Sequence, residues 1–229
     1  MKKDNGFEII NFDHIGKKFS FAINSSIDHI QNIIRNGQFY EIEELSLILK
    51  HCNNIENILD VGANVGNHSV FFSHFLNPKK LYMIEPNPVV IPLLKANLGL
   101  NWHSSLDLSY IGFGLGETEH NANIGPILES NLGGTKLVND DNGSINVYSA
   151  DTLFPNTKFD LIKIDTEGME IEVLNGMTKI LNKVVKIIFI EVLLTLRTEV
   201  INMLEKKGYA FVDEYQRYPK CTNLIFKNI

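Results

Sequence analysis

Cysteine is scarce in this chain, which has only Cys52 and Cys221 among its 229 residues. Two cysteines so far apart provide neither the spacing of a zinc site nor a framework of disulfide bonds. We therefore expect a fold that depends on neither kind of cross-link and a protein that works in a reducing, cytoplasmic setting.

Positive charge is also limited and is not concentrated in any segment. The chain has 21 Lys and Arg residues against 27 Asp and Glu residues, which gives a net charge of −6 at pH 7. No block of basic residues marks a surface for a phosphate backbone, so the composition argues against binding to nucleic acid.

Long hydrophobic runs are absent as well. The longest dense apolar stretch, from Val184 to Leu196, is too short for a membrane span and contains Lys186 and Glu191. The N-terminal segment has two lysines but leads into no apolar region, so we expect neither a signal peptide nor a membrane-spanning helix. The sequence also shows no internal repeat and no low-complexity linker.

What the chain does contain is the composition of a globular domain, with 44% hydrophobic and 21% charged residues. Its length suits one domain with a modest extension. We place the extension at residues 1–52 and the main domain at residues 53–229. In the extension, apolar stretches at 7–12 and 19–23 flank Gly16 and predict a β-hairpin.

Two helices are predicted to follow this hairpin. Ser26 can cap the first helix, and Gly37 can end it. The apolar faces of the two helices are formed by Ile27, Ile30 and Ile34, and then by Ile42, Leu45 and Leu49. We favour a lid that also packs against the main domain over packing alone.

From residue 57 onward strands alternate with helices, which is typical of an α/β domain with a parallel sheet. The strands are expected at residues 57–61, 80–85, 108–115, 159–165, 185–192, 209–214 and 222–226. The helices are expected at 65–76, 90–98, 169–181 (with a break near Gly176) and 195–207. Pro92 should disturb the first turn of its helix, and residues 116–146, rich in Gly and Asn, should be an insertion of loops and short strands.

The arrangement of these elements predicts a Rossmann-like fold. No helix separates the last two strands, so they form a hairpin and the final strand runs antiparallel to its neighbour. The predicted core is a mostly parallel seven-stranded sheet with one antiparallel strand near its edge and helices on both faces. Ligands of such sheets bind at the carboxyl ends of the strands.

The most informative motif is Asp60-Val61-Gly62-Ala63-Asn64-Val65-Gly66, which stands between the first of these strands and the helix that follows. A glycine turn at this position brings backbone N–H groups against a nucleotide-like ligand at a helix N-terminus. Glu85 ends the next strand, where a carboxylate can accept hydrogen bonds from both hydroxyls of a ribose. The two features together predict a cofactor that contains adenosine.

The motif departs from the dinucleotide-binding pattern, which requires three glycines. Asn64 and Asn67 occupy the second and third glycine positions, so a pyrophosphate cannot approach in the usual way. Asp60 would repel a pyrophosphate, but it suits a cation such as the amino group or sulfonium of S-adenosylmethionine. A nicotinamide-dependent reductase is therefore disfavoured. The candidate cofactor contacts are Asp60, Gly62, Ala63, Asn64, Gly66, His68, Glu85 and Pro86.

A second group of acidic residues follows two later strands. Asp165 and Glu167 come after the fourth strand, and Glu191 ends the fifth. Because the carboxyl ends of parallel strands share one edge of the sheet, these three side chains can surround one substrate. Each is a candidate catalytic base, since a carboxylate among other carboxylates tends to have a raised pKa.

With these motifs the chain resembles the FkbM family of S-adenosylmethionine-dependent methyltransferases. The resemblance extends from Tyr40-Glu41 to Phe226. It is carried by the first motif, by Glu85-Pro86-Asn87-Pro88, by Lys163-Ile164-Asp165-Thr166-Glu167-Gly168 with Glu170 and Leu174-Asn175-Gly176, and by Gly208-Tyr209.

The resemblance implies a class I methyltransferase fold and, typically, O-methylation of a hydroxyl on a sugar, glycan or polyketide-type acceptor. It also implies that the first motif and Glu85 contact the cofactor. It assigns no acceptor-binding residue, because the family's substrate contacts vary. The insertion at 116–146 departs most from the family, so the acceptor is not identified at this stage.

Several alternatives stay open. Asp165 and Glu191 also suit a divalent ion such as Mg²⁺, which would bind the acceptor oxygen and lower its pKa, and we do not commit to a metal. His68 is either a further base or a residue at the start of a helix. The chain can also be a module that binds S-adenosylmethionine without catalysis.

Two further groups of residues, one in the middle of the chain and one near its C-terminus, leave a similar choice. Trp102, His103, Tyr215, Arg217 and Tyr218 either line a sugar site or lie in surface loops. The partner is expected to be a small molecule or glycan. The oligomeric state is not predicted.

Overall fold

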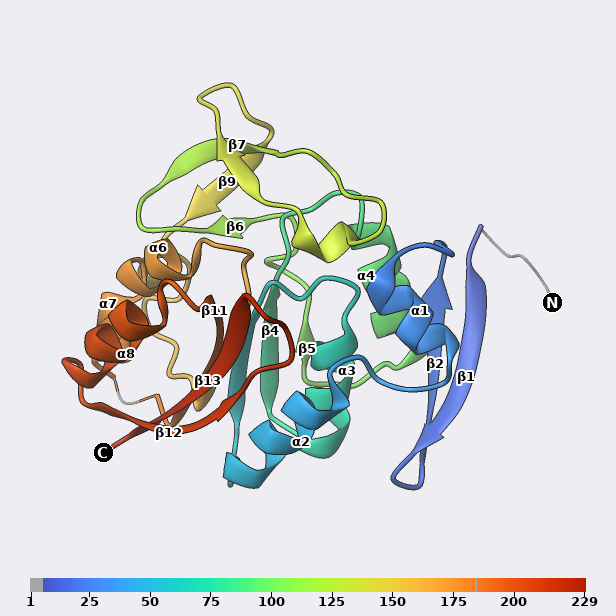
Figure 1. Ribbon diagram of the computed structural model, residues 1–229, viewed down its shortest axis with the longest axis horizontal. Helices are drawn as coiled ribbons and strands as arrows, with labels where there is room; N and C mark the ends of the chain where they lie inside the picture. The colour runs from blue at the N-terminus through green and yellow to red at the C-terminus, as the bar shows by residue number, and fades with distance from the viewer. Residues whose placement is uncertain (1–5, 184) are drawn as a thin grey trace.

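A seven-stranded sheet forms the centre of the computed structural model, which describes residues 6–183 and 185–229 (Figure 1). The strands, in their order across the sheet, are β12 (Tyr209–Tyr215), β13 (Cys221–Asn228), β11 (Ile187–Leu193), β10 (Leu161–Ile164), β3 (Asn57–Val61), β4 (Lys80–Ile84) and β5 (Leu106–Asp107). Only β13 runs antiparallel to its neighbours β11 and β12. The predicted mostly parallel sheet with one antiparallel strand near its edge is confirmed.

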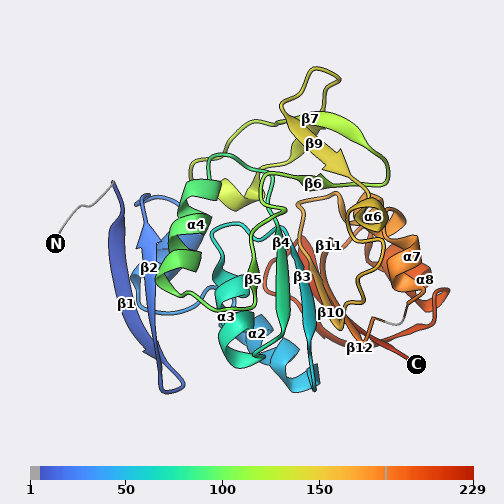
Figure 2. The same ribbon diagram turned by 180° about the vertical axis from the view of Figure 1, so that it is seen from behind.

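Helices cover both faces of this sheet, as predicted. One face packs against α2, α3 and α4, and the other against the short α5 and against α6, α7 and α8 (Figures 1 and 2). Their bounds are α2 (Ile42–His51), α3 (Asn67–Phe75), α4 (Ile91–Leu100), α5 (Ala150–Leu153), α6 (Glu170–Asn175), α7 (Thr178–Leu181) and α8 (Arg197–Glu205). The predicted break near Gly176 separates α6 from α7.

The N-terminal part begins with the antiparallel hairpin of β1 (Glu8–His14) and β2 (Lys17–Ile23), which confirms the predicted hairpin. The helix α1 (His29–Arg35) follows it. The fully buried Asn97 of α4 fixes the hairpin to the main domain, because its Oδ1 accepts a hydrogen bond from the N–H of Ala22 at 2.6 Å. Its Nδ2 donates to the carbonyl of Val65 at 2.8 Å, so the same side chain also supports the turn after β3.

Two details of the predicted helices are wrong. The first helix begins later than expected, because Asp28 rather than Ser26 accepts the capping hydrogen bond from the N–H of Gln31. Ile27 precedes this cap and is 54% exposed. Pro92 does not disturb its helix, because α4 starts at Ile91 and the first turn needs no N–H donor at that position.

The predicted strand at 108–115 is also wrong. In the structure, β5 ends just before residues 108–115, and the two-residue β6 (Gly114–Leu115) lies at their end. These two strands belong to different sheets. Gly112, with φ of +107°, interrupts the extended backbone between them. Its N–H donates to the carbonyl of Glu85, so this stretch crosses the end of β4 instead of lengthening the sheet.

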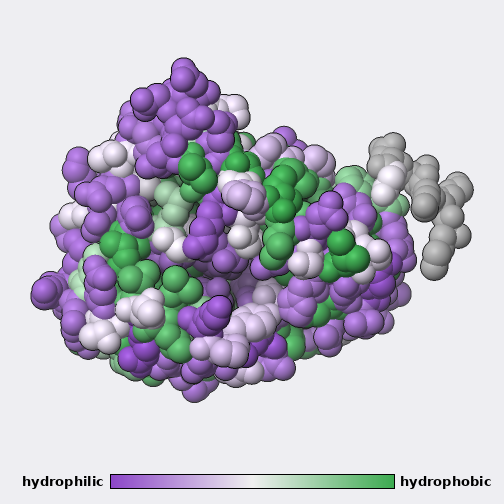
Figure 3. Space-filling view, turned by 45° about the horizontal axis from the view of Figure 1, so that its top comes forward, coloured by the Kyte–Doolittle hydropathy of each residue, from purple (hydrophilic) through white to green (hydrophobic). Residues whose placement is uncertain are grey.

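The insertion that follows forms a second sheet over the carboxyl ends of the central strands (Figure 1). Its order is β6, β9 (Ile145–Tyr148), β7 (His120–Ile124) and β8 (Leu137–Asn139), and a 3₁₀ turn, η1 (Leu132–Gly134), lies between β7 and β8. The projecting part of this sheet is mainly hydrophilic (Figure 3). The predicted loops and short strands are thus confirmed, and they stand above the edge where a ligand of this fold is expected.

The sequence predicts no membrane-spanning helix, and the helices of the structure can be compared with this expectation. Within residues 6–183 and 185–229, no helix has the length and apolar character needed to cross a bilayer. The N-terminal lysines Lys2 and Lys3 and the residue Val184, named in the sequence analysis, lie outside the described residues.

Candidate active site

A cavity of about 440 Å³ lies at the carboxyl ends of β3, β4, β10 and β11. Of the predicted site residues, Gly62, Asn64, Glu85, Pro86, Asp165, Glu167 and Glu191 line it, and Asp60, Ala63, Gly66 and His68 do not. The structure therefore brings all three candidate catalytic carboxylates to the same cavity as half of the candidate cofactor contacts. Hydrophilic and hydrophobic residues both border the hollow on this side of the molecule (Figure 3).

The glycine turn after β3 forms the floor of the cavity. The N–H groups of Gly62 and Ala63 both donate to the carbonyl of Ile84, so the chain bends over the end of the neighbouring strand. Gly62 has φ of +80°, and a Cβ at this position would lie 1.8 Å from the carbonyl oxygen of Asp165. Only glycine permits this contact between the turns that follow β3 and β10.

Glu85 lies at the end of β4, where a ribose is expected. The side chain is 6% exposed and lines the cavity. Its two oxygens accept hydrogen bonds from the N–H groups of Asn64 at 2.7 Å and Asn87 at 2.8 Å. Burial raises the pKa of Glu85 to about 7, although both N–H donors act against this shift. Each oxygen retains a lone pair, which suits hydrogen bonds from two hydroxyl groups.

Asn64 provides a further test of whether a cofactor fits here. Its Oδ1 is buried and has no hydrogen-bond partner, although the residue lines the cavity. A buried polar atom without a partner is costly unless a ligand or water satisfies it. Asn64 and Glu85 therefore form a polar wall that fits the hydroxyl and amino groups of an adenosine.

Asp60 lies behind the cavity. The side chain is fully buried, and the hydroxyl of Ser69 donates to its Oδ2 at 2.6 Å. Its Oδ1 is 3.4 Å from the ammonium nitrogen of Lys163. The cation that Asp60 faces in this structure is thus the side chain of Lys163.

Three other predicted cofactor contacts also lie outside the cavity wall. Gly66, with φ of +86°, is the residue immediately before α3, and Ala63 is buried within the turn. His68 is buried in the first turn of α3, with its Nε2 3.4 Å from a carboxylate oxygen of Glu41. Burial, helped by the nearby Lys163, lowers the pKa of His68 well below its usual value, so the ring is neutral at pH 7.

The ammonium group of Lys163 connects the end of β3 with the turn that follows β10. It is 2% exposed, and its ammonium group donates to the carbonyl of Gly62 at 2.8 Å. Asp60 and Asp165 each place a carboxylate oxygen 3.4 Å from its Nζ. Burial alone would lower the pKa of Lys163, but Asp165, Asp60 and Glu41 outweigh burial and raise it, so the lysine stays charged.

A fourth carboxyl group, Glu41, joins the three that were predicted. It is 6% exposed and lines the cavity from the start of α2. Burial, together with the charge of Asp165, raises the pKa of Glu41 to about 8. The sequence alone assigns no role to Glu41. The feature of the sequence that could have indicated Glu41 is its position at the start of the family resemblance.

The other two glutamates also have raised pKa values. For Glu167 the causes are burial and the charge of Asp165. For Glu191 they are burial and the charges of Asp165 and Glu41. Groups whose pKa lies closer to neutrality than an ordinary carboxyl are better suited to accept and release protons near pH 7.

Three of the six non-glycine residues with a positive φ in the described part of the chain line this cavity. Glu41, Asn64 and Glu167 have φ values of +56°, +49° and +57°, and all three line it. A positive φ is uncommon for residues other than glycine, and such conformations cluster at functional sites. Two of these three residues, Glu41 and Glu167, also have carboxyl groups whose pKa is raised by burial and by the charge of Asp165.

The roof of the cavity comes from the insertion. Asn131, Gly133, Thr135 and Leu137 line the cavity from above. The buried carboxylate of Asp28 holds this roof, because its Oδ2 accepts a hydrogen bond from the N–H of Leu132 at 2.9 Å.

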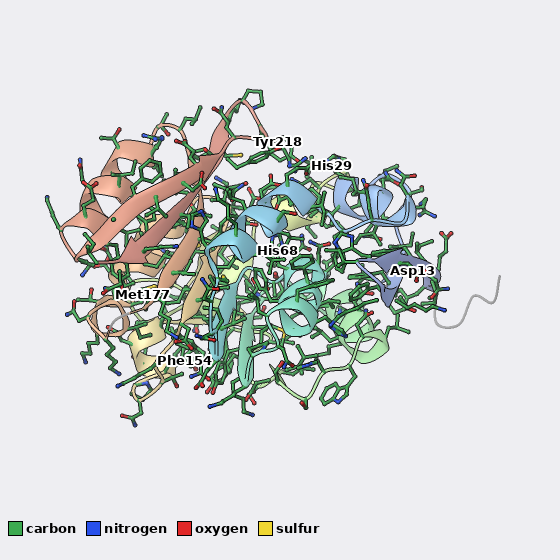
Figure 4. The ribbon with its side chains drawn as sticks, turned by 90° about the horizontal axis from the view of Figure 1, so that it is seen from below. Asp13, His29, His68, Phe154, Met177 and Tyr218 are labelled. Carbon is green, nitrogen blue, oxygen red and sulfur yellow. The ribbon has the colours of Figure 1, made fainter. Side chains whose placement is uncertain are left out.

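The mouth of the cavity is bordered by aromatic side chains from three distant segments. Nε2 of His29 lies 3.0 Å from the hydroxyl oxygen of Tyr218, which is 3.1 Å from that of Tyr40. Figure 4 shows Tyr218 and His29 next to each other at the edge of the molecule. Tyr218 thus lines the cavity, whereas Trp102 is 63% exposed and lies outside it.

The other residues considered for a sugar site are engaged elsewhere. Arg217 forms ion pairs with Glu43 and the buried Glu44. His103 is hydrogen-bonded with Ser105 and Asn77. Tyr215 does not line this cavity.

The hypothesis of a divalent metal ion needs a group of ligands around one point in the described part of the chain. Within residues 6–183 and 185–229, no group of three or more His, Cys, Asp or Glu side chains is placed to hold one metal ion. Asp165 and Glu191 line the same cavity, but the ammonium of Lys163 lies 3.4 Å from a carboxylate oxygen of Asp165.

The raised pKa values predict how stability depends on pH. A carboxyl whose pKa rises from 4.5 to about 7 in Glu85, or to about 8 in Glu41, binds more protons in the folded chain than in the unfolded chain. The free energy of unfolding therefore falls as pH rises from about 4.5 to about 8. The expected slope is about 1.4 kcal/mol per pH unit for each group that titrates. Urea denaturation at half-unit steps of pH measures it.

The variant Glu41→Gln provides the control for this slope. Its amide does not titrate, so the decline in stability between pH 7 and pH 8 becomes shallower, because Glu41 has the higher of the two pKa values. A wild-type protein whose unfolding free energy increases over this range would contradict the assignment of these buried carboxyl groups.

Known proteins are similar to this chain in sequence and in fold. Residues 60–211 match the family model described as "Methyltransferase FkbM domain". The hexuronic acid methyltransferase AglP of Haloferax volcanii is 28% identical over 174 residues, which cover 74% of this chain and 70% of that protein.

Two solved structures share the fold at low sequence identity. The precorrin-6y C5,15-methyltransferase of Geobacter metallireducens superposes with a TM-score of 0.52 at 14% identity, covering 90% of this chain and 93% of that one. TYW2 of M. jannaschii, solved in complex with AdoMet, gives 0.51 at 15% identity, with coverage of 100% and 90%. The family match covers most of the chain and contains the turn after β3, Glu85 and the carboxylates after β10 and at β11. The chain therefore belongs to the FkbM family of S-adenosylmethionine-dependent methyltransferases and has the class I methyltransferase fold.

Proposed function

We propose that the enzyme transfers a methyl group to a hydroxyl oxygen of a sugar or glycan. The observation that carries the proposal is the single cavity in which Glu85 and Asn64 form one wall and Asp165, Glu167 and Glu191 form another. The relative from Haloferax volcanii supports a sugar acceptor, since its name states a hexuronic acid.

Glu85, Asn64 and the backbone of the Gly62 turn would hold the cofactor. When bound, S-adenosylmethionine supplies an electrophilic methyl group on a sulfonium. The roof formed by residues 131–137 reduces the access of water, and the enclosed walls hold an acceptor hydroxyl in line for displacement.

Glu167 is our choice for the base that takes the proton of the acceptor hydroxyl. It lines the cavity, and its backbone holds it there with a positive φ. Its pKa is raised by burial and by Asp165, whereas Asp165 itself lies 3.4 Å from the ammonium of Lys163. The carboxylate of Asp165 is thus engaged with a cation, so we assign the proton-accepting role to Glu167. Asp165 and Glu191 then orient the acceptor.

We also propose that the N-terminal residues act as a lid for this cavity. His29, Ile30, Tyr40 and Glu41 line the cavity from that side. Asp28 links the same segment to the roof through Leu132. An N-terminal part that only packed against the main domain would not contribute so many residues to the cavity wall.

The variant Glu167→Gln tests the assignment of the base. We expect kcat to fall on the order of 100-fold, because the amide cannot accept the proton. Affinity for S-adenosylmethionine, measured by calorimetry, should stay within about threefold. Glu119→Gln, an exposed glutamate outside the cavity, serves as the matched control. An unchanged kcat in Glu167→Gln would remove Glu167 from this role.

The acceptor class is tested by mass spectrometry with a panel of glycans, nucleotide sugars and polyketides. The proposal expects a gain of one methyl group on a sugar hydroxyl, dependent on S-adenosylmethionine. Methylation of a carbon or nitrogen atom, or of polyketides alone, would overturn it. Binding of the cofactor without turnover on any acceptor would favour a module that binds S-adenosylmethionine without catalysis.

A further inference from the structure

The acceptor half of the cavity, defined here as Glu41, Asp165, Glu167 and Glu191, is strongly acidic. All four carboxyl groups line the cavity, and none of the described lining residues is Lys or Arg. These groups influence one another, because the charge of Asp165 raises the pKa of each of the three glutamates. An acceptor therefore meets hydrogen-bond acceptors on several sides.

The basic side chains nearest to this half are occupied or peripheral. Lys163 lies beneath the cavity and donates to the carbonyl of Gly62. Arg217 is paired with Glu43 and Glu44. Lys136 is an exposed residue whose ammonium lies beside Gly168, outside the cavity lining, and its charge lowers the pKa of Glu167.

Of the two histidines near this half, one is buried behind it and the other lies at the cavity mouth. His68 is buried behind Glu41, and its pKa is lowered by burial. His29 lies at the exposed mouth, hydrogen-bonded with Tyr218. Tyr40 and Tyr218 contribute neutral hydroxyls, since burial raises the pKa of both.

The balance of charge therefore disfavours an anionic acceptor. The ammonium of Lys163 is shared between Asp60 and Asp165, so the carboxyl groups of this half outnumber the positive charges near them. Protonation of the glutamates, whose pKa values are raised, reduces the negative charge but supplies no positive one. The sulfonium of a bound cofactor offsets one negative charge. An acceptor carboxylate or phosphate would enter without a basic partner, and a charge without a partner in a desolvated site is strongly disfavoured.

We propose that the acceptor is a sugar without negative charge and that an amino sugar complements this half of the cavity best. Carboxylates accept hydrogen bonds from pairs of sugar hydroxyls, and they accept stronger, charge-assisted ones from an ammonium group. The inference rests on the proposed function and names its substrate class. It separates this chain from the Haloferax relative, which by name acts on a hexuronic acid.

Matched glycosides test the selectivity directly. The protein is saturated with S-adenosylhomocysteine, and calorimetry at pH 7 measures binding of the methyl glycosides of glucosamine, glucose and glucuronic acid, together with their galacto counterparts. We expect the amino sugar to bind most tightly within a series and the uronic acid at least tenfold more weakly. Equal or tighter binding of the uronic acid would overturn the inference, and so would the absence of binding by all members.

Proton release provides a second readout. Because the glutamates of this half have raised pKa values, an amino sugar that is already protonated in solution should expel protons when it binds among them, whereas a neutral sugar should not. Calorimetry in two buffers with different ionisation enthalpies, at a pH below the pKa of the sugar's amine, measures this number of protons. Equal proton release by glucosaminide and glucoside would contradict the proposed contact.

Charge-neutral variants then identify the residues responsible. Glu41→Gln and Glu191→Gln should each narrow the preference for the amino sugar over the uronic acid severalfold, measured as the ratio of dissociation constants. Glu119→Gln should leave the ratio unchanged. An unchanged ratio in both cavity variants, with S-adenosylhomocysteine still bound, would overturn the inference.

The outcome is separable from that of the proposed function. If turnover assays show that the uronic acid is methylated fastest on a hydroxyl, the acceptor inference fails and sugar O-methylation stands. If the wild-type protein does not bind S-adenosylhomocysteine, the cofactor site fails first and the acceptor inference fails with it.

Discussion

Replacing Lys163 with methionine should lower the free energy of unfolding by about 3–5 kcal/mol, because it leaves buried carboxylates without their cation. Lys163 is 2% exposed, and its partner Asp60 is fully buried. Methionine fills a similar volume, so the loss reflects charge more than packing. Urea denaturation at pH 7 measures the change, and methyl transfer should be lost in parallel because Asp165 loses the ammonium beside it.

A surface pair of the same chemistry is the control. Lys79 and Glu56 form an ion pair at 2.8 Å, but their side chains are 72% and 54% exposed. Lys79→Met should change stability by less than about 1 kcal/mol. In the double variant Lys163→Met with Asp60→Asn, part of the loss should be recovered, since the amide needs no counter-charge. Equal effects of Lys163→Met and Lys79→Met would show that the buried cation is not needed.

Replacing Gly62 with alanine should have an effect at least as large. The new Cβ would lie 1.8 Å from the carbonyl oxygen of Asp165, and both atoms belong to backbone that the sheet holds in place. The φ of +80° adds strain of its own. We expect a loss of roughly 4 kcal/mol or more in the free energy of unfolding. Calorimetry should detect no binding of S-adenosylmethionine by any folded fraction.

Gly208 separates the two causes of this loss. It has φ of +87°, but a Cβ added to it meets nothing within 4 Å. Gly208→Ala therefore carries the backbone strain without the clash and should cost about 1–2 kcal/mol. If the two alanine variants were equally stable, the close approach of the two turns would have no structural importance.

Much of the fold could be predicted because its central strands are short apolar runs with clear ends. Residues 57–61 form a strand in both the prediction and the structure, since an apolar run meets glycine at one end. The strand at 108–115 failed for a different reason. Its composition suits a strand, but the conformation of Gly112 turns the chain across the end of β4.

In the candidate site, too, some features could be predicted from the sequence and others could not. The sequence predicted that the carboxylates after β10 and at β11 would share one edge, and the parallel sheet places them in one cavity. It did not predict the partner of Asp60, because that depends on register. Lys163 lies directly opposite Asp60 in the paired strands, a relation between residues far apart in the chain.

Glu41 shows a further limit of the sequence. A left-handed backbone at a glutamate has no compositional signal, and local propensity argues against it. Glu41 is recognised as part of the site only in the structure, where the start of α2 places it in the cavity wall. Charge and burial then separate it from the neighbouring Glu43, which is exposed and paired with Arg217.

Asp28 has a consequence for how substrates enter. One carboxylate oxygen caps α1 through Gln31, and the other holds the roof through Leu132. Lifting of the roof would remove one of the two hydrogen bonds of this buried carboxylate, which carries a cost unless water replaces it. One side chain thus ties the start of α1 to the segment that covers the cavity.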